Sequence, residues 1–296
     1  MAELKTNWKN LVKMAVQGKP ANPLRFGEFE MDWKGQGHSL PSVGGITYNV
    51  KVGDSAFHWR GDHIEPGVSM VLDEEKRSSK QNMALQFLAC VGNEAVVVSG
   101  AAKGARGVVV GHHGGVEHMI VDFDDKTLNK LTYDDKILIK AFGQGLKLLD
   151  VPEVFVYNLD PGVLKPWGVR ISGGKLEVPV TMTVPSSLMG SGLGHGDPAT
   201  GDYDITTQDA KAVKRYGLDQ LRFGDFVAIM DADNTFGRHY FEGAVTIGVV
   251  AHSDSFLSGH GPGISTLFSS RTPAIRPKIS YNANLANVLK IGRYRK

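Results

Sequence analysis

Residues 221–265 read LRFGDFVAIMDADNTFGRHYFEGAVTIGVVAHSDSFLSGHGPGIS, and this stretch indicates the fold more clearly than any other part of the chain. It contains two apolar runs, residues 226–230 and residues 244–251, each bounded by glycine or charge. Short apolar runs of this kind are typical of buried strands. We therefore expect two buried strands here, close in space and paired with each other.

Polar side chains crowd the places where these two runs end. They are Asp231, Asp233, Arg238, His239, Glu242, His252, Asp254 and His260. In extended backbone, residues two apart point to the same face, so Asp231 and Asp233 would project together. Carboxylates and imidazoles at strand ends are how a β scaffold assembles a metal or acid–base site. The alternative is that these charges only solvate loops and turns.

A glycine-rich loop precedes this region, at residues 190–204 (GSGLGHGDPATGDYD). Such a loop can bring backbone N–H groups close to a ligand, because glycine permits the positive φ that this requires. Its polar residues are His195, Asp197, Asp202 and Asp204. Further imidazoles occur in GHHGGVEH (residues 111–118) and in RGDHIEPGVS (residues 60–69).

This mixture of oxygen and imidazole donors indicates a site for zinc, manganese or a similar divalent ion more than it indicates a thiolate-type site. We expect a divalent metal ion, zinc first and manganese or calcium as alternatives. The expected metal ligands are Asp231, Asp233, His252 and His195. The expected catalytic residues are Glu242, as general base, and His113. The expected substrate-binding residues are Gly192, Gly194, His63 and Arg238.

The composition favours a β-rich globular protein. Glycine accounts for 36 of 296 residues, well above the roughly 7% that is usual, and this excess indicates many tight turns. The predicted fold class is α+β, a β-rich two-lobed architecture with mixed sheets or barrels and a few short helices. The helices are expected near residues 6–18, 81–90 and 206–217. The lobes are expected at residues 1–170 and at residues 171–296, the second carrying most of the candidate site residues.

Charge and hydropathy exclude several classes of protein. The net charge is only +2, so no nucleic-acid partner is expected. No apolar run is long enough to span a membrane, and the N-terminus lacks an apolar leader. Cys90 is the single cysteine, which excludes an intrachain disulfide. We expect a cytoplasmic homo-oligomer that binds a small-molecule substrate.

Several segments together resemble an uncharacterised prokaryotic family that is described only as a domain of unknown function. They are GDHIEPGVS, VVVSGAAKGARGVVVGHHGG, KAFGQGL, GSGLGHGDPATGDYDI, the run from LRFGDF to AHSDS, and SGHGPG. The resemblance covers nearly the whole chain. It implies no activity.

A second resemblance is to the acetamidase/formamidase family of β-rich, metal-binding amidases. The glycine loop at residues 190–197, the Asp231-Ala232-Asp233 element and Glu242-Gly243 follow in that family's order. The chain departs from the family in having Asp233 where a histidine is expected, and in lacking an Asn-Met-Asp loop. The resemblance implies a metal-dependent amidase.

The leading hypothesis is therefore a metal-dependent hydrolase that acts on a small C–N substrate resembling an amide. The alternative is a non-catalytic, oligomeric protein that binds a small molecule or a metal. A third hypothesis is a metal-independent isomerase or lyase that uses histidine and aspartate as acid and base.

Overall fold

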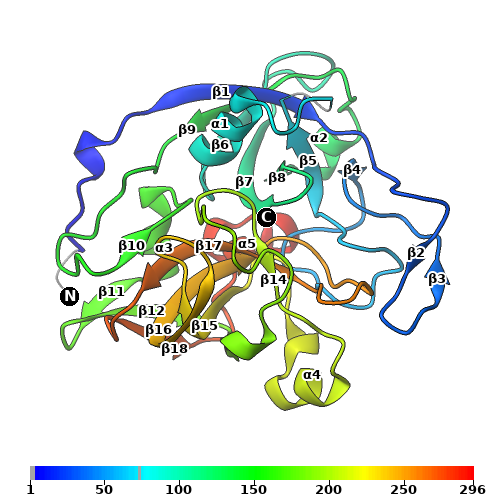
Figure 1. Ribbon diagram of the computed structural model, residues 1–296. Coiled ribbons are helices and arrows are strands. Elements are labelled where there is room, and N and C mark those ends of the chain that lie inside the picture. The colour runs from blue at the N-terminus through cyan, green and yellow to red at the C-terminus, as the bar shows by residue number, and fades with distance from the viewer. Residues whose placement is uncertain (1–3, 73–74) are drawn as a thin grey trace.

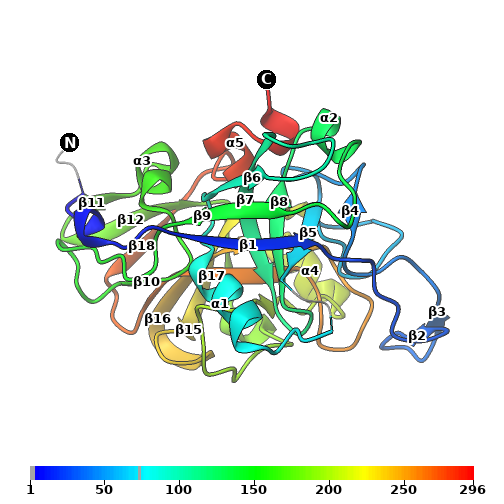
Figure 2. The same cartoon turned by 90° about the horizontal axis from the view of Figure 1, so that it is seen from above.

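Six antiparallel strands close into a barrel in the computed structural model, which describes residues 4–72 and 75–296 (Figure 1). Around the barrel they are β1 (Met14–Pro20), β9 (Ile137–Ala141), β6 (Glu94–Val97), β7 (Arg106–His113), β8 (His118–Asp122) and β5 (Gly67–Val71). Strand β1 closes the ring, since it pairs with β9 along most of its length and with β5 at its end. Figure 2 shows β1 running beside both.

Gly18 allows β1 to change partners. A Cβ atom at this position would lie 2.4 Å from the carbonyl oxygen of Val71.

The barrel interior is filled by alternating aliphatic side chains such as Ile137, Ile139 and Met119, each fully buried. Burying a side chain of this size contributes about 1.5–3 kcal/mol, so the closed barrel has a core of its own.

A second sheet lies beside the barrel and contains both strands predicted from residues 221–265. Its order is β10 (Phe155–Val156), β17 (Gly263–Ser270), β16 (His239–Val250), β15 (Phe226–Asp233) and β13 (Met182–Pro185), with β14 (Tyr203–Asp204) also paired to β17. Strands β15 and β16 are antiparallel, from the pair Phe226↔Val249 to the pair Met230↔Val245. Both predicted strands, and their pairing, are confirmed.

The remaining elements are small. A third sheet holds β11 (Arg170–Ser172), β12 (Lys175–Val180) and β18 (Ile275–Ile279), and a hairpin of β2 (Glu30–Met31) and β3 (Gly37–His38) stands away from the barrel in Figure 1. Strand β4 (Ile46–Thr47) pairs with β5. The helices are α1 (Lys80–Leu88), α2 (Asp125–Leu128), α3 (Leu164–Trp167), α4 (Ala210–Tyr216) and α5 (Leu285–Leu289). The predicted α+β class, with a barrel, mixed sheets and short helices, is confirmed. No helix among the described residues is long and apolar enough to cross a membrane.

Two of the three predicted helices are present, as α1 and α4. The predicted helix over residues 6–18 is wrong. Helix α4 ends at Gly217, which has φ 63°, and is capped by Asp209. In place of a helix over residues 6–18, the chain forms a single 3-10 turn (Trp8–Asn10) and then β1. Of the apolar residues that suggested a buried helix face, Trp8, Val12 and Ala15 are exposed, Val12 by 72%, and only Leu11 packs against a core. Pairing with β9 and β5 thus overrides the local helical pattern.

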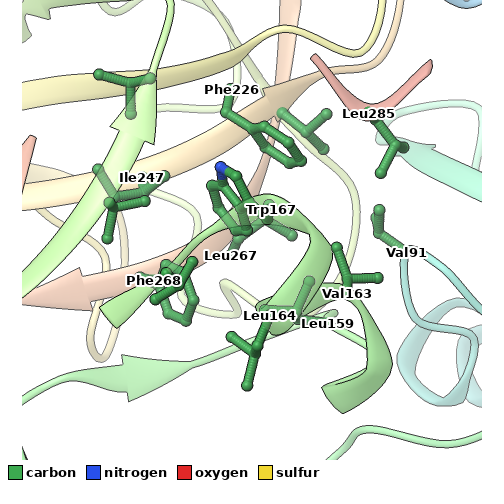
Figure 3. Packing of buried hydrophobic residues seen from close by; sticks show 14 of the residues in the cluster. Val91, Leu159, Val163, Leu164, Trp167, Phe226, Ile247, Leu267, Phe268 and Leu285 are labelled. Atoms are coloured by element: carbon green, nitrogen blue, oxygen red, sulfur yellow. The ribbon is translucent and has the colours of Figure 1, made fainter. Parts of the chain in front are cut away.

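Trp167 anchors the core of the second sheet. Its ring stacks on Phe226, with centroids 3.7 Å apart, and lies 5.5 Å from the ring of Phe268 (Figure 3). Its indole Nε1 donates a hydrogen bond to the carbonyl oxygen of Pro179 at 2.8 Å. The large apolar surface and the satisfied N–H group together stabilise this packing.

We expect Trp167→Ala to lower the free energy of unfolding by about 3–5 kcal/mol, because it leaves a large cavity in this core. Urea unfolding followed by circular dichroism measures the change. The matched control is Trp8→Ala, whose side chain is half exposed, and which should change stability by about 0.5 kcal/mol or less. Equal effects of the two substitutions would contradict this account of the core.

Candidate metal centre

Three imidazoles and two carboxylates converge between the barrel and the second sheet. His113 ends β7, and His252 lies just beyond the end of β16. Asp202 and Asp204 flank Tyr203 in and beside β14, and His63 lies in the segment that leads to β5. All five side chains are buried. The centre is therefore assembled from four separate segments, and both halves of the chain contribute.

A close contact between the two sheets fixes these positions. Ser265 of β17 accepts a hydrogen bond from the His112 backbone N–H at 2.9 Å, and its hydroxyl lies 3.2 Å from the His112 carbonyl oxygen, to which it donates. Gly111 faces Ala251, where an added Cβ would come within 2.8 Å of the alanine methyl carbon. The absence of a side chain at residue 111 lets β7 approach the sheet, and this approach brings His113 beside His252, with ring centroids 4.1 Å apart.

The donor atoms form two overlapping sets, His63–Asp204–His252 and His113–Asp202–His252. Within each set the ligand atoms all lie within 4.8 Å of one another. His252 Nε2 is 2.9 Å from Asp202 Oδ2 and 3.4 Å from Asp204 Oδ1. Ligand atoms bound at about 2.1 Å to one ion lie roughly 3–4 Å apart, so small side-chain adjustments would bring these atoms onto a single ion.

His252 has the surroundings that make this cluster a candidate cation site. Its Nδ1 lies 2.9 Å from the Ser253 carbonyl oxygen, which places the ring proton on Nδ1 and leaves a lone pair on Nε2. Although His252 Nε2 and Asp202 Oδ2 are close, their angles are not those of a hydrogen bond, and both atoms are buried without a hydrogen-bond partner. Two buried acceptor atoms that face a common point normally require a cation between them.

The other two imidazoles are oriented in the same way. His113 Nδ1 donates to Glu65 Oε1 at 2.7 Å, and His63 Nδ1 donates to Asp62 Oδ2. Metal-binding histidines usually donate their second ring N–H to a carboxylate or a carbonyl, which fixes the ring and its tautomer. All three rings here have such a partner on Nδ1, so Nε2 is the nitrogen that each could offer to an ion. The Nε2 atom of His63 lies 3.0 Å from His260 Nδ1, so an ion would have to replace that contact.

Glu65 is the most deeply enclosed of these partners. It is buried, and it accepts hydrogen bonds from His113, from His118 Nδ1 at 3.0 Å, from the Ser69 hydroxyl and from the Gly44 N–H at 2.9 Å. Burial opposes its ionisation, but the two imidazoles outweigh that effect and hold the pKa of the carboxyl well below its usual value. A buried anion of this kind requires positive charge nearby, and a metal ion on His113 would supply it.

In the absence of an ion, protons take its place. Burial disfavours the charged form of His63, but its hydrogen bonds with Asp204 and Asp62 outweigh this and raise its pKa to about 9. The pKa of His252 is likewise raised well above its usual value, because Asp202 and Asp204 outweigh the effect of burial. Binding of a divalent ion would therefore release these protons.

The centre opens into a cavity of about 540 Å³. His63, His113, Asp202 and Asp204 all line it, together with His260. Glu117, in the turn between β7 and β8, lines it as well and is half-buried. Burial raises the pKa of the Glu117 carboxyl above its usual value. A carboxyl with a raised pKa on the wall of the same cavity as a candidate metal site is a candidate for proton transfer.

Six of the ten residues predicted from the sequence lie in the centre or on the cavity wall. His63, His113 and His252 are in the centre, and Gly192, His195 and Arg238 line the cavity. Arg238 is buried, and it donates hydrogen bonds to the carbonyl oxygens of Thr200 and Asp202, so it braces the loop that carries the carboxylates. Gly194 is exposed and does not line the cavity.

The other three predicted residues, Asp231, Asp233 and Glu242, lie away from the centre. A bulge follows Met230, and Asp231 has φ 58°, so the alternation that would align it with Asp233 is lost. Asp233 pairs instead with Arg271 at 2.5 Å, and Glu242 is exposed on β16. The carboxylates that do converge belong to the second Asp-x-Asp element, DYD at residues 202–204.

Comparisons with known proteins agree with the resemblance to an uncharacterised family and name no activity. Family models described as the N-terminal and C-terminal parts of a domain of unknown function, DUF4438, match residues 29–165 and 166–289. A solved structure, "Crystal structure of TM1086", is similar with a TM-score of 0.91 and 44% identity, over 97% of this chain and 99% of that one. No curated protein matches. The acetamidase/formamidase resemblance receives no support from these comparisons.

We expect the metal-free protein to lose stability as the pH rises from about 6.5 to 9. The pKa of His63 is about 9 in the folded, metal-free state, so its protonation stabilises the fold fully below pH 6.5, and that contribution of up to about 3 kcal/mol disappears by pH 9. Urea unfolding after treatment with a chelator, at pH 6 and pH 9, measures this loss. It should be smaller in His63→Gln; a loss of equal size in that variant would show that another group titrates.

We expect Gly263→Ala to prevent metal binding. Its Cβ would lie 1.9 Å from Asp202 Oδ2 and 2.1 Å from His252 Nε2, so it would occupy the space between two donors. Elemental analysis of the purified variant measures the bound metal. The matched control is Gly196→Ala in the glycine loop, where a Cβ meets nothing within 4 Å; this variant should retain the wild-type metal content.

Proposed function

Because the chain belongs to the DUF4438 family, whose description assigns no activity, we propose its function from the candidate metal centre: a metal-dependent hydrolase of a small amide-like substrate. One observation carries the proposal. Three imidazoles, each oriented by a second hydrogen bond, and two carboxylates converge at one wall of a cavity. The proposed ligands are His63, His113, His252, Asp202 and Asp204.

The donor set favours zinc, with manganese as the second choice. Three imidazole nitrogens and two carboxylates are donors that both ions accept. Calcium prefers six to eight oxygen ligands, so a centre with three nitrogens suits it poorly.

The cavity favours a catalytic role over a structural one. Structural zinc sites are closed, whereas catalytic sites keep one coordination position open to water or substrate. Four of the five proposed ligands line the cavity wall, so a small molecule can reach the centre. When bound there, a divalent ion would polarise a carbonyl group and lower the pKa of a coordinated water molecule.

Residues of this chain can provide the proton transfers that amide hydrolysis needs. We assign Glu117 as general base, because it lines the cavity and its pKa is raised by burial. The Nδ1 atom of His260 lies 3.0 Å from Asp204 Oδ2. The His260 side chain lines the cavity and is partly exposed. It is placed to donate a proton to the departing nitrogen. An amine is a poor leaving group unless it is protonated, so a separate acid favours an amide over an ester as the substrate.

A backbone donor could stabilise the oxyanion. The N–H groups of Gly190, Ser191, Leu193, Gly194 and His195 all donate hydrogen bonds within the protein. The N–H of Gly192 donates to no described residue, and Gly192 lines the cavity. This N–H is therefore available to a developing negative charge on the substrate.

The decisive measurement is metal content combined with hydrolysis of an amide panel. Glu117→Gln should retain the metal and reduce kcat by about 10²- to 10⁴-fold, since glutamine cannot accept a proton. Asp204→Asn should lose most of the metal, because a neutral amide is a weaker ligand than a carboxylate.

Glu242→Gln is the matched comparison, because Glu242 is exposed and lies outside the cavity. It should retain both metal and activity. A wild-type protein purified without metal, and unable to take up zinc, would overturn the proposal. Bound metal without turnover of any amide would instead favour the non-catalytic binding protein.

A further inference from the structure

We propose that the substrate carries an apolar group of several carbon atoms, which the cavity holds beside the metal centre. This inference rests on the proposed hydrolase function and specifies its substrate class as amides with an extended aliphatic or aromatic group. Formamide and acetamide would lack most of the binding energy that the cavity offers.

The size of the cavity is the first observation. Its volume of about 540 Å³ is within the range of roughly 300–1,000 Å³ that holds a drug-sized ligand. A site made for a two-carbon amide would need far less space, and water would fill the remainder. The cavity therefore indicates a substrate much larger than the group that reacts.

The second observation is an apolar lining drawn from separate parts of the fold. Its members are Phe26, Val43, Met83, Val116 and Leu257. Val43 and Val116 are buried and form a fixed surface, whereas Met83 on α1 and Leu257 are partly exposed. Met83 has an unbranched side chain, which can adapt to ligands of different shape.

The cavity lining combines polar and apolar groups. The glycine loop contributes Ser191, Gly192, His195, Thr200 and Gly201. The N-terminal half of the chain contributes four of the five apolar residues, together with the polar residues Glu30, Ser42, Asp62, His63, His113 and Glu117. A substrate with a polar reacting group and an apolar tail matches this lining, because the lining offers contacts of both kinds.

Phe26 extends the apolar lining to the protein surface. Its side chain is 64% exposed although it lines the cavity. An exposed phenylalanine at the rim would gain buried area when an apolar group lies against it. The tail of the substrate is therefore expected to reach the rim.

A series of linear hydroxamic acids tests this inference without requiring turnover. Hydroxamates chelate zinc, so acetohydroxamate, butanohydroxamate and hexanohydroxamate should all bind the zinc-loaded protein through the same head group. Isothermal titration calorimetry measures each dissociation constant. We expect affinity to rise about fourfold for each added methylene, the gain that burial of one methylene gives.

Two variants link that gain to the wall. Met83→Ala and Leu257→Ala should leave the affinity for acetohydroxamate unchanged and weaken binding of hexanohydroxamate about tenfold. The control is Phe87→Ala, on the same helix as Met83 but exposed and outside the cavity lining. It should bind the whole series as the wild-type protein does.

The outcomes separate this inference from the proposed function. If acetohydroxamate binds but affinity does not rise with chain length, the apolar wall is not a substrate site and the hydrolase proposal stands. If zinc binds but no hydroxamate does, the centre has no open position, and both proposals are overturned. If zinc does not bind, both are likewise overturned.

Discussion

The approach of strand β7 to strand β17 determines where everything else in the candidate centre lies. The Ser265 hydroxyl bonds to both backbone groups of His112, and Gly111 leaves room for Ala251. His113 and His252 each lie a residue or two beyond this contact, so the spacing of the two sheets sets the spacing of their imidazoles. A side chain at residue 111 would separate the sheets and pull one histidine away from the carboxylates. The barrel and the second sheet thus act as two rigid supports for one site.

Electrostatics explains why this arrangement is a candidate site for a cation. Asp62, Glu65, Asp202 and Asp204 are all buried within the same group of histidines. Buried carboxylates are costly unless positive charge balances them, and in the metal-free protein the protons held by His63 and His252 supply that charge at neutral pH. Protein sequences that fold well depart from such rules mainly at functional sites. A buried group of charges of this kind is therefore a candidate binding site.

Local patterns in the sequence were enough to predict the strands at residues 226–230 and 244–251, two of the helices and the β-rich class. These local patterns did not predict that the barrel closes, because β1 pairs with strands distant in the chain while its own residues suggest a helix. The histidines could be found, since each stands near a strand end. The carboxylates could not be chosen, because residues 202–204 and residues 231–233 are both Asp-x-Asp and only the backbone geometry distinguishes them. A bulge and a φ of 58° at Asp231 disrupt the second of these elements. Glu117 was missed because nothing in the sequence shows that its turn faces the cavity.

The pairing of β1 has a consequence for the order in which the protein is made. Met14 pairs with Ala141, so the first barrel strand leaves the ribosome long before its partner exists. The end of β1 can pair with β5 sooner, through Pro20 and Met70, but the rest of β1 must wait for β9, and non-local pairing of this kind slows folding. The proposed ligands run from His63 to His252 in the sequence, so a nascent chain cannot assemble the complete set. An ion bound at this centre would therefore report that the two halves of the chain have folded together.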